Sequence, residues 1–359
     1  MLLNDTERAV FALRELYASR GYRPYKMSRF EEYALYARNK EFLSSEQIIT
    51  FPARDGRLLA LKPDVTLSIV KNGPRKPGAV EKVYYSESVY RSDAGGVMRE
   101  LTQTGLECVG DLQSYDIAEV VLLAVRSLQL MGKRYILDIS HMGLIGGILD
   151  PIPEPLREQA TECLQQKNIH GLKGLDIPGK EKLIALIENA GPAAQVLPSL
   201  SAILDSDEEK LALGELCRIV AILEDQGLGD SLRVDFSLIG GMAYYNGIVF
   251  RGYLEGIPER VLSGGQYDRL ASGMGRNNRA IGFAVYVDLL EQLQKDTQAD
   301  VDAVLLISGE EDGLLIQRVA EELGKQGSVR LCSSLPEDCC PRKVYQFVSG
   351  KAVKWDGND

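Results

Sequence analysis

Residues 82–110, which read KVYYSESVYRSDAGGVMRELTQTGLECVG, constrain the fold of this chain more than any other stretch. β-Branched and aromatic residues flank a polar connection that contains Gly95 and Gly96. The pattern predicts a strand that ends in Arg91, a turn, and a returning strand that begins near Glu100. An antiparallel pair of this kind is a platform around which the rest of the chain is organised.

The returning strand carries a polar row in which Gln103, Gly105 and Glu107 share one face. The apolar positions between them do not all fit the other face, so the alternation is imperfect and the strand is expected to be covered on both sides. A polar row on a covered face can hold a ligand. The alternative is that these are edge or surface positions, and the pattern by itself favours neither.

Composition and charge narrow the classes of protein to consider. The chain has 359 residues, of which 45% are apolar and 26% charged, enough for two or three compact units. Its formal net charge is −10, which argues against extensive binding to a nucleic-acid backbone. No apolar run reaches membrane-spanning length and the first residues lack a secretory pattern, so the expected compartment is the cytoplasm.

Cysteine and histidine usage gives little support to metal or nucleophile chemistry. The six cysteines form no CxxC pair, so neither a zinc site nor a disulfide scaffold is expected. His141 and His170 are the only histidines, which makes a histidine-rich metal site and a Ser-His-Asp arrangement improbable. Each is expected to have an incidental surface role.

The first part of the chain predicts a helix over residues 4–20 and a hairpin that starts within residues 42–51. The second hairpin strand ends at Lys62 and Pro63 and leads into a helix that begins near Asp64 or Thr66. Asp64 therefore lies at a strand-to-helix corner. Its simplest role there is to cap the helix.

Beyond the platform, the pattern predicts a helix over residues 114–131, then a strand, then a helical insertion at about 150–229. The acidic run in the insertion is expected to be the charged start of one helix. Strands resume at Leu232, and Gly264 and Gly265 are placed in a glycine-rich turn before the strand of AIGFAVYVDLL. These glycines either allow a close backbone approach or only mark turns and bulges. Residues 300–359 predict a small β-α-β unit with a terminal hairpin.

Six blocks, in this order, resemble the catalytic core of class II histidyl-tRNA synthetases: ALKPDVT, YYSESVYRSD, ELTQTGLECVG, GGMAYYNGIVF, SGGQYDRL and AIGFAVYVDLL. The resemblance covers most of residues 1–295, apart from the helical insertion. It implies an α+β fold in which an antiparallel sheet is flanked by helices, and a core that dimerises. Residues 300–359, outside this resemblance, are small for a nucleotide-binding domain and carry no phosphate-binding glycine fingerprint, so they are expected to be an accessory or interface module.

The resemblance also implies a histidine site. The positions that match it are Asp64, Thr66 and Gln103 for the α-ammonium group, and Glu107, Tyr244 and Tyr245 on the imidazole side. A carboxylate and neutral acceptors suit an ammonium group, and a second carboxylate can accept from an imidazole N–H. Arg91 matches the arginine that contacts the α-phosphate of ATP.

Two departures from the synthetase pattern bear on activity. Gly240 and Ala243 replace the arginine and aspartate of the RGLDYY block, and Leu289 replaces the arginine that ends the GFAxGxER block. Fixed guanidinium groups stabilise the charge that develops during amino-acid activation, and losing one typically costs about a hundredfold or more in rate. The sequence therefore predicts no catalysis and no cofactor, and Arg91 becomes a remnant of activation.

A synthetase-like core of this kind resembles the regulatory subunit of ATP phosphoribosyltransferase, the first enzyme of histidine biosynthesis. The resemblance implies a hetero-octamer with the short-form catalytic subunit and feedback inhibition by histidine. The shortened C-terminal module and the acidic net charge point away from tRNA, and no membrane partner is expected. Gly240 also removes the arginine that would reach the ligand carboxylate, which implies weak histidine binding or a group from the partner. The alternatives are an active histidyl-tRNA synthetase and a synthetase-like paralogue with another ligand or partner.

Overall fold

The computed structural model divides the chain into two compact units. One comprises residues 6–291, here called the core, and the other comprises residues 292–359 with the first five residues. The residues that the structure describes are 5–39, 48–74, 76–92, 95–132, 134–239, 245–274, 278–293, 301–336 and 339–355.

The predicted platform forms the longest strand pair of the core. β5 (Val80–Ser92) and β6 (Met98–Gly110) are antiparallel over their whole lengths, with Val80 opposite Gly110 and Ser92 opposite Met98. From residue 103 to residue 110 every residue of β6 is buried. The expectation that this strand is covered on both sides is therefore confirmed.

Nine strands form the core sheet in the order β1-β5-β6-β12-β11-β10-β7-β9-β8. Most neighbours are antiparallel, and the β1–β5 and β7–β9 pairs are parallel. The other strands are β1 (Arg23–Pro24), β7 (Tyr135–His141), β8 (Gly191–Pro192), β9 (Leu232–Val234), β10 (Ile248–Leu254), β11 (Leu262–Gln266) and β12 (Arg279–Tyr286). A short 3-10 helix, η3 (Val287–Leu293), follows β12.

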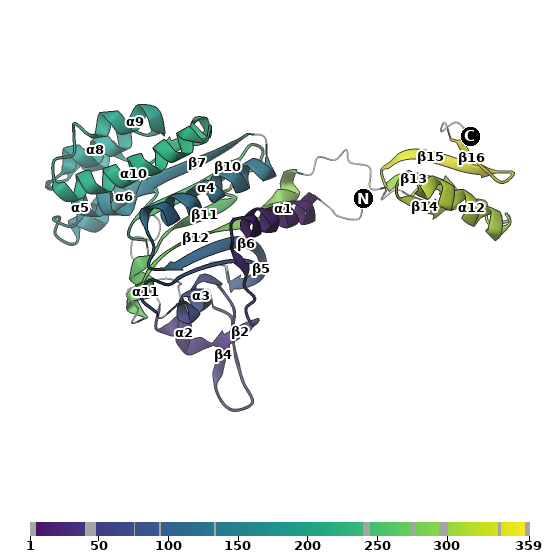
Figure 1. Ribbon diagram of the computed structural model, residues 1–359, viewed down its shortest axis with the longest axis horizontal. Helices are drawn as coiled ribbons and strands as arrows, with labels where there is room; N and C mark the ends of the chain where they lie inside the picture. Colours follow the sequence, from purple (N-terminus) through teal and green to yellow (C-terminus); the bar gives the residue numbers. More distant parts are fainter. Residues whose placement is uncertain are drawn as a thin grey trace. The chain divides into compact units, whose positions relative to one another are not determined.

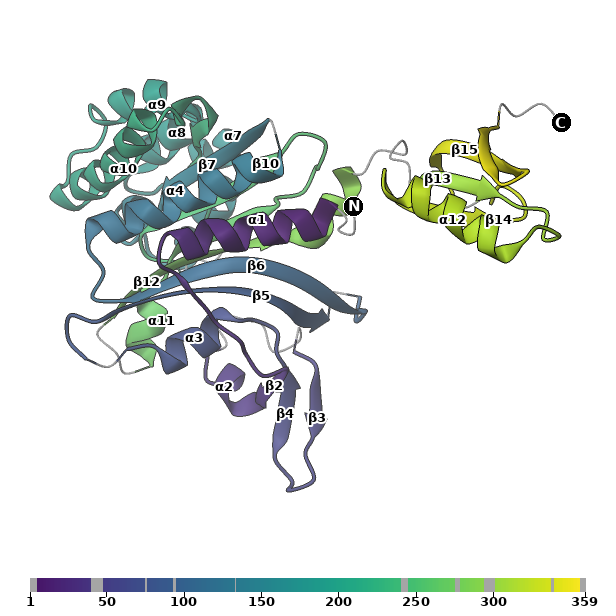
Figure 2. The same cartoon turned by 45° about the vertical axis from the view of Figure 1, so that its right-hand side comes forward.

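Helices cover both faces of this sheet (Figures 1 and 2). α1 (Asp5–Ser19) and α4 (Ser114–Met131) lie on one face, where the Tyr17 ring packs edge-on to Phe283 at 5.9 Å and the Tyr17 hydroxyl is 2.9 Å from that of Ser127. α3 (Thr66–Asn72) and α11 (Asp268–Gly273) lie on the other face. We call this second face the α3 face.

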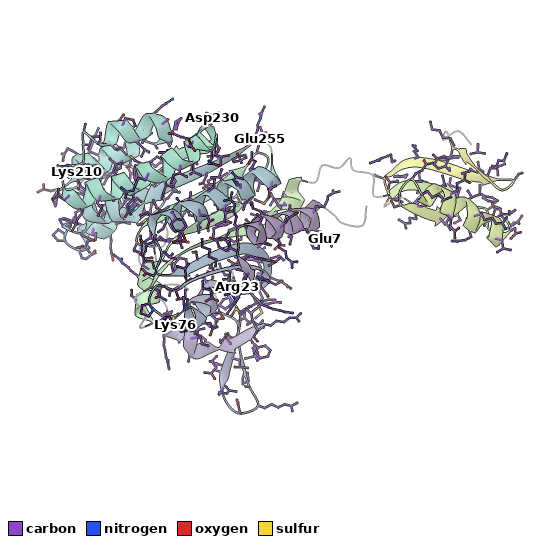
Figure 3. All side chains as sticks on the ribbon, viewed as in Figure 1. Glu7, Arg23, Lys76, Lys210, Asp230 and Glu255 are labelled. Atoms are coloured by element: carbon purple, nitrogen blue, oxygen red, sulfur yellow. The ribbon has the colours of Figure 1, made fainter. Side chains whose placement is uncertain are left out.

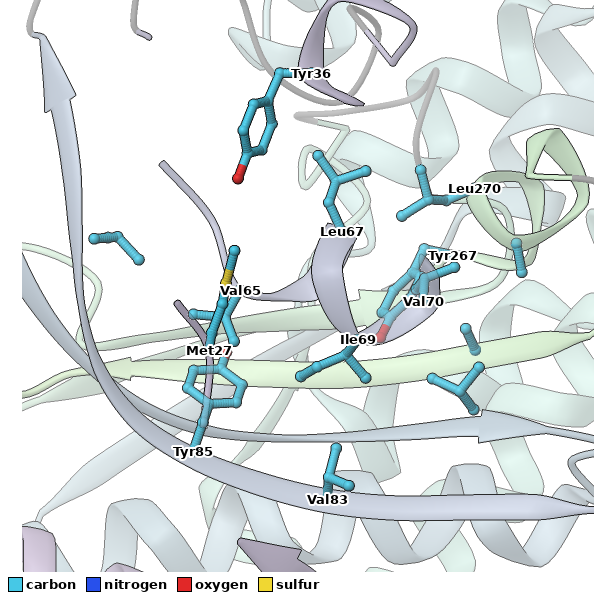
Figure 4. Packing of buried hydrophobic residues seen from close by; sticks show 14 of the residues in the cluster. Met27, Tyr36, Val65, Leu67, Ile69, Val70, Val83, Tyr85, Tyr267 and Leu270 are labelled. Atoms are coloured by element: carbon cyan, nitrogen blue, oxygen red, sulfur yellow. The ribbon is translucent and has the colours of Figure 1, made fainter. Parts of the chain in front are cut away.

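The α3 face has its own apolar core, built around α3 (Figure 4). Five consecutive residues of the helix, from Thr66 to Val70, are buried, because the sheet lies on one side and a smaller sheet and α11 on the others. The smaller sheet has the order β2-β4-β3. Its strands are β2 (Phe30–Glu32), β3 (Thr50–Pro52) and β4 (Leu58–Leu61), and α2 (Tyr33–Ala37) follows β2.

Helices dominate the residues between β7 and β9. They are α5 (Met142–Leu149), α6 (Leu156–Gln165), α7 (Ile169–Gly174), α8 (Lys180–Glu188), α9 (Ala193–Leu200), α10 (Asp207–Asp225) and the 3-10 helix η2 (Gly229–Ser231). The acidic run begins α10, as predicted, and Ser206 and Glu209 form a capping box there. Lys182 of α8 donates to both oxygens of Glu209, which ties the two helices together.

The unit formed by residues 292–359 has a four-stranded sheet in the order β14-β13-β15-β16, and α12 (Gly313–Gly324) joins β13 to β14. The strands are β13 (Val301–Leu306), β14 (Val329–Cys332), β15 (Pro341–Val348) and β16 (Lys351–Lys354). β13 and β14 are parallel and β15 and β16 form a hairpin. The predicted β-α-β order and terminal hairpin are confirmed.

Two local predictions are wrong. Gly264 and Gly265 lie in the strand β11, not in a turn. Glycine is needed at both positions because a side chain would collide with neighbouring residues: a Cβ on Gly264 would lie 2.4 Å from Phe283 Cβ. His141 is 5% exposed and is not a surface residue. Its Nδ1 accepts from the backbone N–H of Gly143 at the start of α5, and its Nε2 lies 3.1 Å from Glu215 Oε2.

The charged side chains labelled on the core in Figure 3, from Glu7 to Glu255, are exposed.

His170 is exposed as expected, and all six cysteines are free thiols. Among the described residues, no helix combines the length and apolar character that crossing a membrane requires.

Candidate functional site

The candidate site lies on the α3 face of the sheet, where the strand register brings polar side chains together. Residues directly opposite each other on neighbouring strands point to the same face. Glu87, Gln103 and Tyr286 form one row across β5, β6 and β12. Glu107, four residues after Gln103 on β6, points to the same face and lies opposite Gly282 of β12. The polar row predicted on β6 is therefore the centre of a covered face.

Glu107 is the most enclosed charged group of the site, with 2% of its surface exposed. The Thr66 hydroxyl donates to Oε1 at 2.7 Å and the Tyr267 hydroxyl donates to Oε2. Burial raises the pKa of this carboxyl to about 8, although the hydrogen bonds from Tyr267 and Thr66 act to lower it. Glu107 thus holds a proton that an ordinary glutamate has released at neutral pH.

Gly282 makes room for this carboxyl. A Cβ on Gly282 would lie 1.6 Å from Glu107 Oε2, so only glycine fits at this position of β12. Gly265, on the neighbouring strand, makes room for the Tyr245 ring. A Cβ on Gly265 would lie 2.8 Å from two carbons of that ring. Both glycines allow close approach, which was one of the two interpretations that the sequence left open.

Asp64 lies at the corner between β4 and α3, as predicted, and it has two partners. Oδ1 accepts from the backbone N–H of Leu67 at 2.9 Å, so the carboxylate does serve the first turn of α3. Oδ2 lies 3.9 Å from Arg91 Nη2, and Arg91 Nε donates to the Pro63 carbonyl at 2.7 Å. Burial raises the pKa of Asp64, while the positive charge of Arg91 and the backbone N–H groups oppose that rise.

Gln103 is 3% exposed and lies between Glu87 and Tyr286. Within the described ranges, no hydrogen bond joins its side-chain amide to another residue. Glu87 instead pairs with Lys62, itself only 2% exposed. The amide of Gln103 is consequently available to a ligand on the α3 face.

The tyrosines of the site include some that the sequence prediction missed. Tyr245 was predicted, and burial raises its pKa, as do the charges of Glu107 and Asp64. Tyr267 and the buried Tyr85 were not predicted, although Tyr267 directly follows the strand with two glycines, which is the signal that could have found it. Gly240, Ala243 and Tyr244 lie outside the described residues, and Leu289 is half-buried in η3.

The arrangement suits a small ligand that carries several N–H donors. Asp64 and Glu107 are two buried carboxyl groups near Thr66: Asp64 precedes it by two residues, and Glu107 accepts from its hydroxyl. The Gln103 amide lies on the same face of β6 as Glu107. Among the residues that the structure describes, no three His, Cys, Asp or Glu side chains come together as a metal site would require. An ammonium group near Asp64 and a ring N–H near Glu107 would satisfy both carboxyl groups.

Comparison with known proteins shows the family and the fold of the chain. The family model for histidyl-tRNA synthetase matches residues 3–290. The chain is 30% identical over 340 residues to the ATP phosphoribosyltransferase regulatory subunit of Caldanaerobacter subterraneus subsp. tengcongensis, a match that covers 88% of this chain and 86% of the relative.

Solved structures share the fold. An ATP phosphoribosyltransferase regulatory subunit/histidyl-tRNA synthetase from Bacillus halodurans C superposes with a TM-score of 0.75 at 24% identity, covering 95% of this chain and 93% of that one. A chain of the ATP phosphoribosyl transferase (HisG:HisZ) complex from Thermotoga maritima gives 0.63 at 22% identity, covering 80% and 98%. The expected class II synthetase-like α+β fold is confirmed.

Proposed function

The chain belongs to the family of ATP phosphoribosyltransferase regulatory subunits, which has the core of the histidyl-tRNA synthetases, and from this premise we propose that it activates the short-form catalytic subunit and makes that enzyme sensitive to histidine. The proposed assembly is a hetero-octamer in the cytoplasm, and the core also pairs with a second copy of itself. The partner in the Thermotoga complex supports this partnership.

The observation that carries the histidine part is the enclosed Glu107 with its two hydroxyl donors. An unperturbed imidazole has a pKa of about 6.5, below the value of about 8 for Glu107. At neutral pH the two groups therefore share one proton, and either can donate it to the other. Asp64, Thr66 and Gln103 then receive the α-ammonium group, and Tyr244 and Tyr245 close the imidazole side.

The chain is proposed to bind histidine without reacting. Gly240 and Leu289 stand where the synthetase pattern has arginines, so two fixed positive charges that would stabilise amino-acid activation are missing. Arg91 remains, but its guanidinium is engaged by Pro63 and lies beside Asp64. We treat Arg91 as a remnant of a phosphate contact, and no tRNA or cofactor takes part in the proposed function.

Binding without reaction is sufficient for regulation. Histidine shifts an equilibrium between two states of a complex if it binds one state more tightly than the other, and a tenfold preference corresponds to about 1.4 kcal/mol. α3 connects the site to the rest of the core, because Thr66 donates to Glu107 while the following residues pack in the apolar cluster of the α3 face.

Calorimetric titration of histidine into the complex of this chain with the catalytic subunit tests the proposal. Histidine should bind, and Glu107→Gln should weaken the binding by about tenfold or more because the shared proton is lost. Glu255→Gln, which removes an exposed carboxylate of the same core, is the control and should have no effect. Histidine-dependent exchange of pyrophosphate into ATP by the chain alone would instead identify an active synthetase.

A further inference from the structure

Arg251 of β10 is a positively charged residue on the α3 face, and it has no role in the proposed histidine site described so far. Gly105, Ala284, Ser263 and Arg251 are directly opposite one another across β6, β12, β11 and β10. They therefore share the face that carries Gln103 and Glu107. Strands are about 4.8 Å apart, so this row extends about 14 Å from Gly105 to Arg251.

Between Glu107 and Arg251, the strands β12 and β11 contribute only glycine, alanine and serine to this face, and the Tyr245 ring lies over Gly265. Gly282 and Gly265 lie in the row of Glu107, and Ala284 and Ser263 lie in the row of Arg251. Ala284, Ser263 and Arg251 are each half-buried, whereas the residues next to them in sequence are buried against the opposite face. An arginine side chain can extend over these small residues toward a ligand bound at Glu107.

The guanidinium of Arg251 has no fixed partner in the described parts of the chain, where no hydrogen bond or ion pair joins it to another residue. Its charge nevertheless reaches the site, because it lowers the pKa of Tyr245, the same hydroxyl whose pKa the negative charges of Glu107 and Asp64 raise. Tyr245 thus lies within electrostatic range of the two carboxyl groups and of Arg251.

Histidine carries a carboxylate, and none of the residues proposed so far to contact the ligand has a positive charge. Arg91 is held beside Asp64 and at Pro63, and position 240 is a glycine. An unpaired carboxylate in a half-buried site next to two acidic side chains would oppose binding strongly. We propose that Arg251 binds the carboxylate of the histidine ligand, so that this chain supplies from β10 the positive charge that is absent at position 240. The proposal rests on the proposed function.

The alternative role for Arg251 is structural. It lies directly opposite Asp138 of β7, and its charge also acts on that carboxyl. Arg233 of β9 lies opposite Asp138 on the other side, and its Nε is 3.8 Å from Asp138 Oδ1. The substitution R233Q is therefore a matched control. It removes the same charge beside the same carboxyl, but from a strand that lies two positions farther from Glu107 in the sheet.

The test compares histidine with histamine, which keeps the ammonium group and the imidazole but lacks the carboxylate. Both ligands are titrated calorimetrically into the complex of the chain with the catalytic subunit, using the unaltered chain, R251Q, R251K and R233Q. Losing a charge-assisted hydrogen bond should weaken histidine binding to R251Q by about 10- to 100-fold. Histamine binding should change by less than about twofold, R251K should lose less than R251Q, and R233Q should bind both ligands normally.

Unchanged histidine binding by R251Q overturns the proposal, as does equal weakening of histidine and histamine, which would mean a structural role. Histamine binding to R251Q also shows that the variant is folded. If R251Q binds neither ligand, the test is made with R251K, by comparing its loss of histidine binding with its loss of histamine binding. If the unaltered complex binds neither ligand, the proposed function fails and this inference fails with it. If the complex binds histidine and only the arginine comparison fails, the proposed function stands.

Discussion

Replacing Glu107 by glutamine should change how the stability of the core depends on pH. The pKa of this carboxyl is about 8 in the folded core and 4.5 in its ordinary state, so between these values the folded chain keeps a proton that the unfolded chain has released. Because the folded pKa is the higher one, this contribution to stability is complete below pH 4.5 and is lost as the pH rises through 8. Glutamine does not titrate.

The size of the effect follows from that gap. Stability should fall by about 1.4 kcal/mol for each pH unit between roughly pH 5 and 8 in the unaltered chain relative to Glu107→Gln. Over the whole gap of about 3.5 pH units the difference amounts to roughly 5 kcal/mol. Asp138, whose pKa burial also raises, is present in both chains, so its contribution cancels. The charge of Asp64 is itself one cause of the raised pKa of Glu107 and is therefore part of the measured difference.

Urea unfolding at several pH values measures this difference. Trp355 is the only tryptophan and lies in the unit of residues 292–359, so its fluorescence follows that unit, whereas far-ultraviolet circular dichroism follows chiefly the helices of the core. The pH-dependent difference should appear in the dichroism signal and be absent from the fluorescence signal. Parallel stability curves for the two chains between pH 5.5 and 7.5 would refute the protonated state of Glu107.

Three further predictions concern the same carboxyl. Gly282→Ala should abolish histidine binding and destabilise the core by about 1–3 kcal/mol, because its Cβ would overlap Glu107 Oε2, whereas Gly174→Ala, whose Cβ meets no atom within 4 Å, should bind histidine normally in the same titration. Thr66→Val removes the donor to Oε1 and should raise the pKa of Glu107 further, so the pH at which the unfolding curve levels off should increase; an unchanged pH would contradict the role of Thr66. Histidine affinity should be greatest between about pH 6.5 and 8, where one proton is shared between the imidazole and Glu107, and a monotonic pH profile would rule this out.

The sequence predicted the platform and the residues on it because strand alternation and glycine-containing turns are local signals. It also placed Asp64 and Thr66 at a strand-to-helix corner, since a proline after a strand marks such a corner. It failed at Gly264 and Gly265, where two glycines in succession resemble a turn. Their role in a central strand depends on Phe283 and Phe250 of neighbouring strands and on the Tyr245 ring, which precedes β10, and none of these contacts can be read locally.

His141 illustrates a second limit. A polar residue after an apolar strand is typical of a surface turn, but the chain enters α5 at once, and α10, about seventy residues later, brings Glu215 to the other ring nitrogen. Arg251 was missed for a related reason, because its place beside the site follows from the strand order β6-β12-β11-β10. Residues close in space through sheet order leave no pattern along the chain.

The rate of the short-form catalytic subunit, measured alone, with this chain, and with this chain plus histidine, tests directly whether this chain is a regulatory subunit that senses histidine. The chain should raise the rate, and histidine should lower it again. The Glu107→Gln chain should still raise the rate but should lose most of the response to histidine. A rate that this chain leaves unchanged, or one that responds to histidine equally with and without it, would contradict the account.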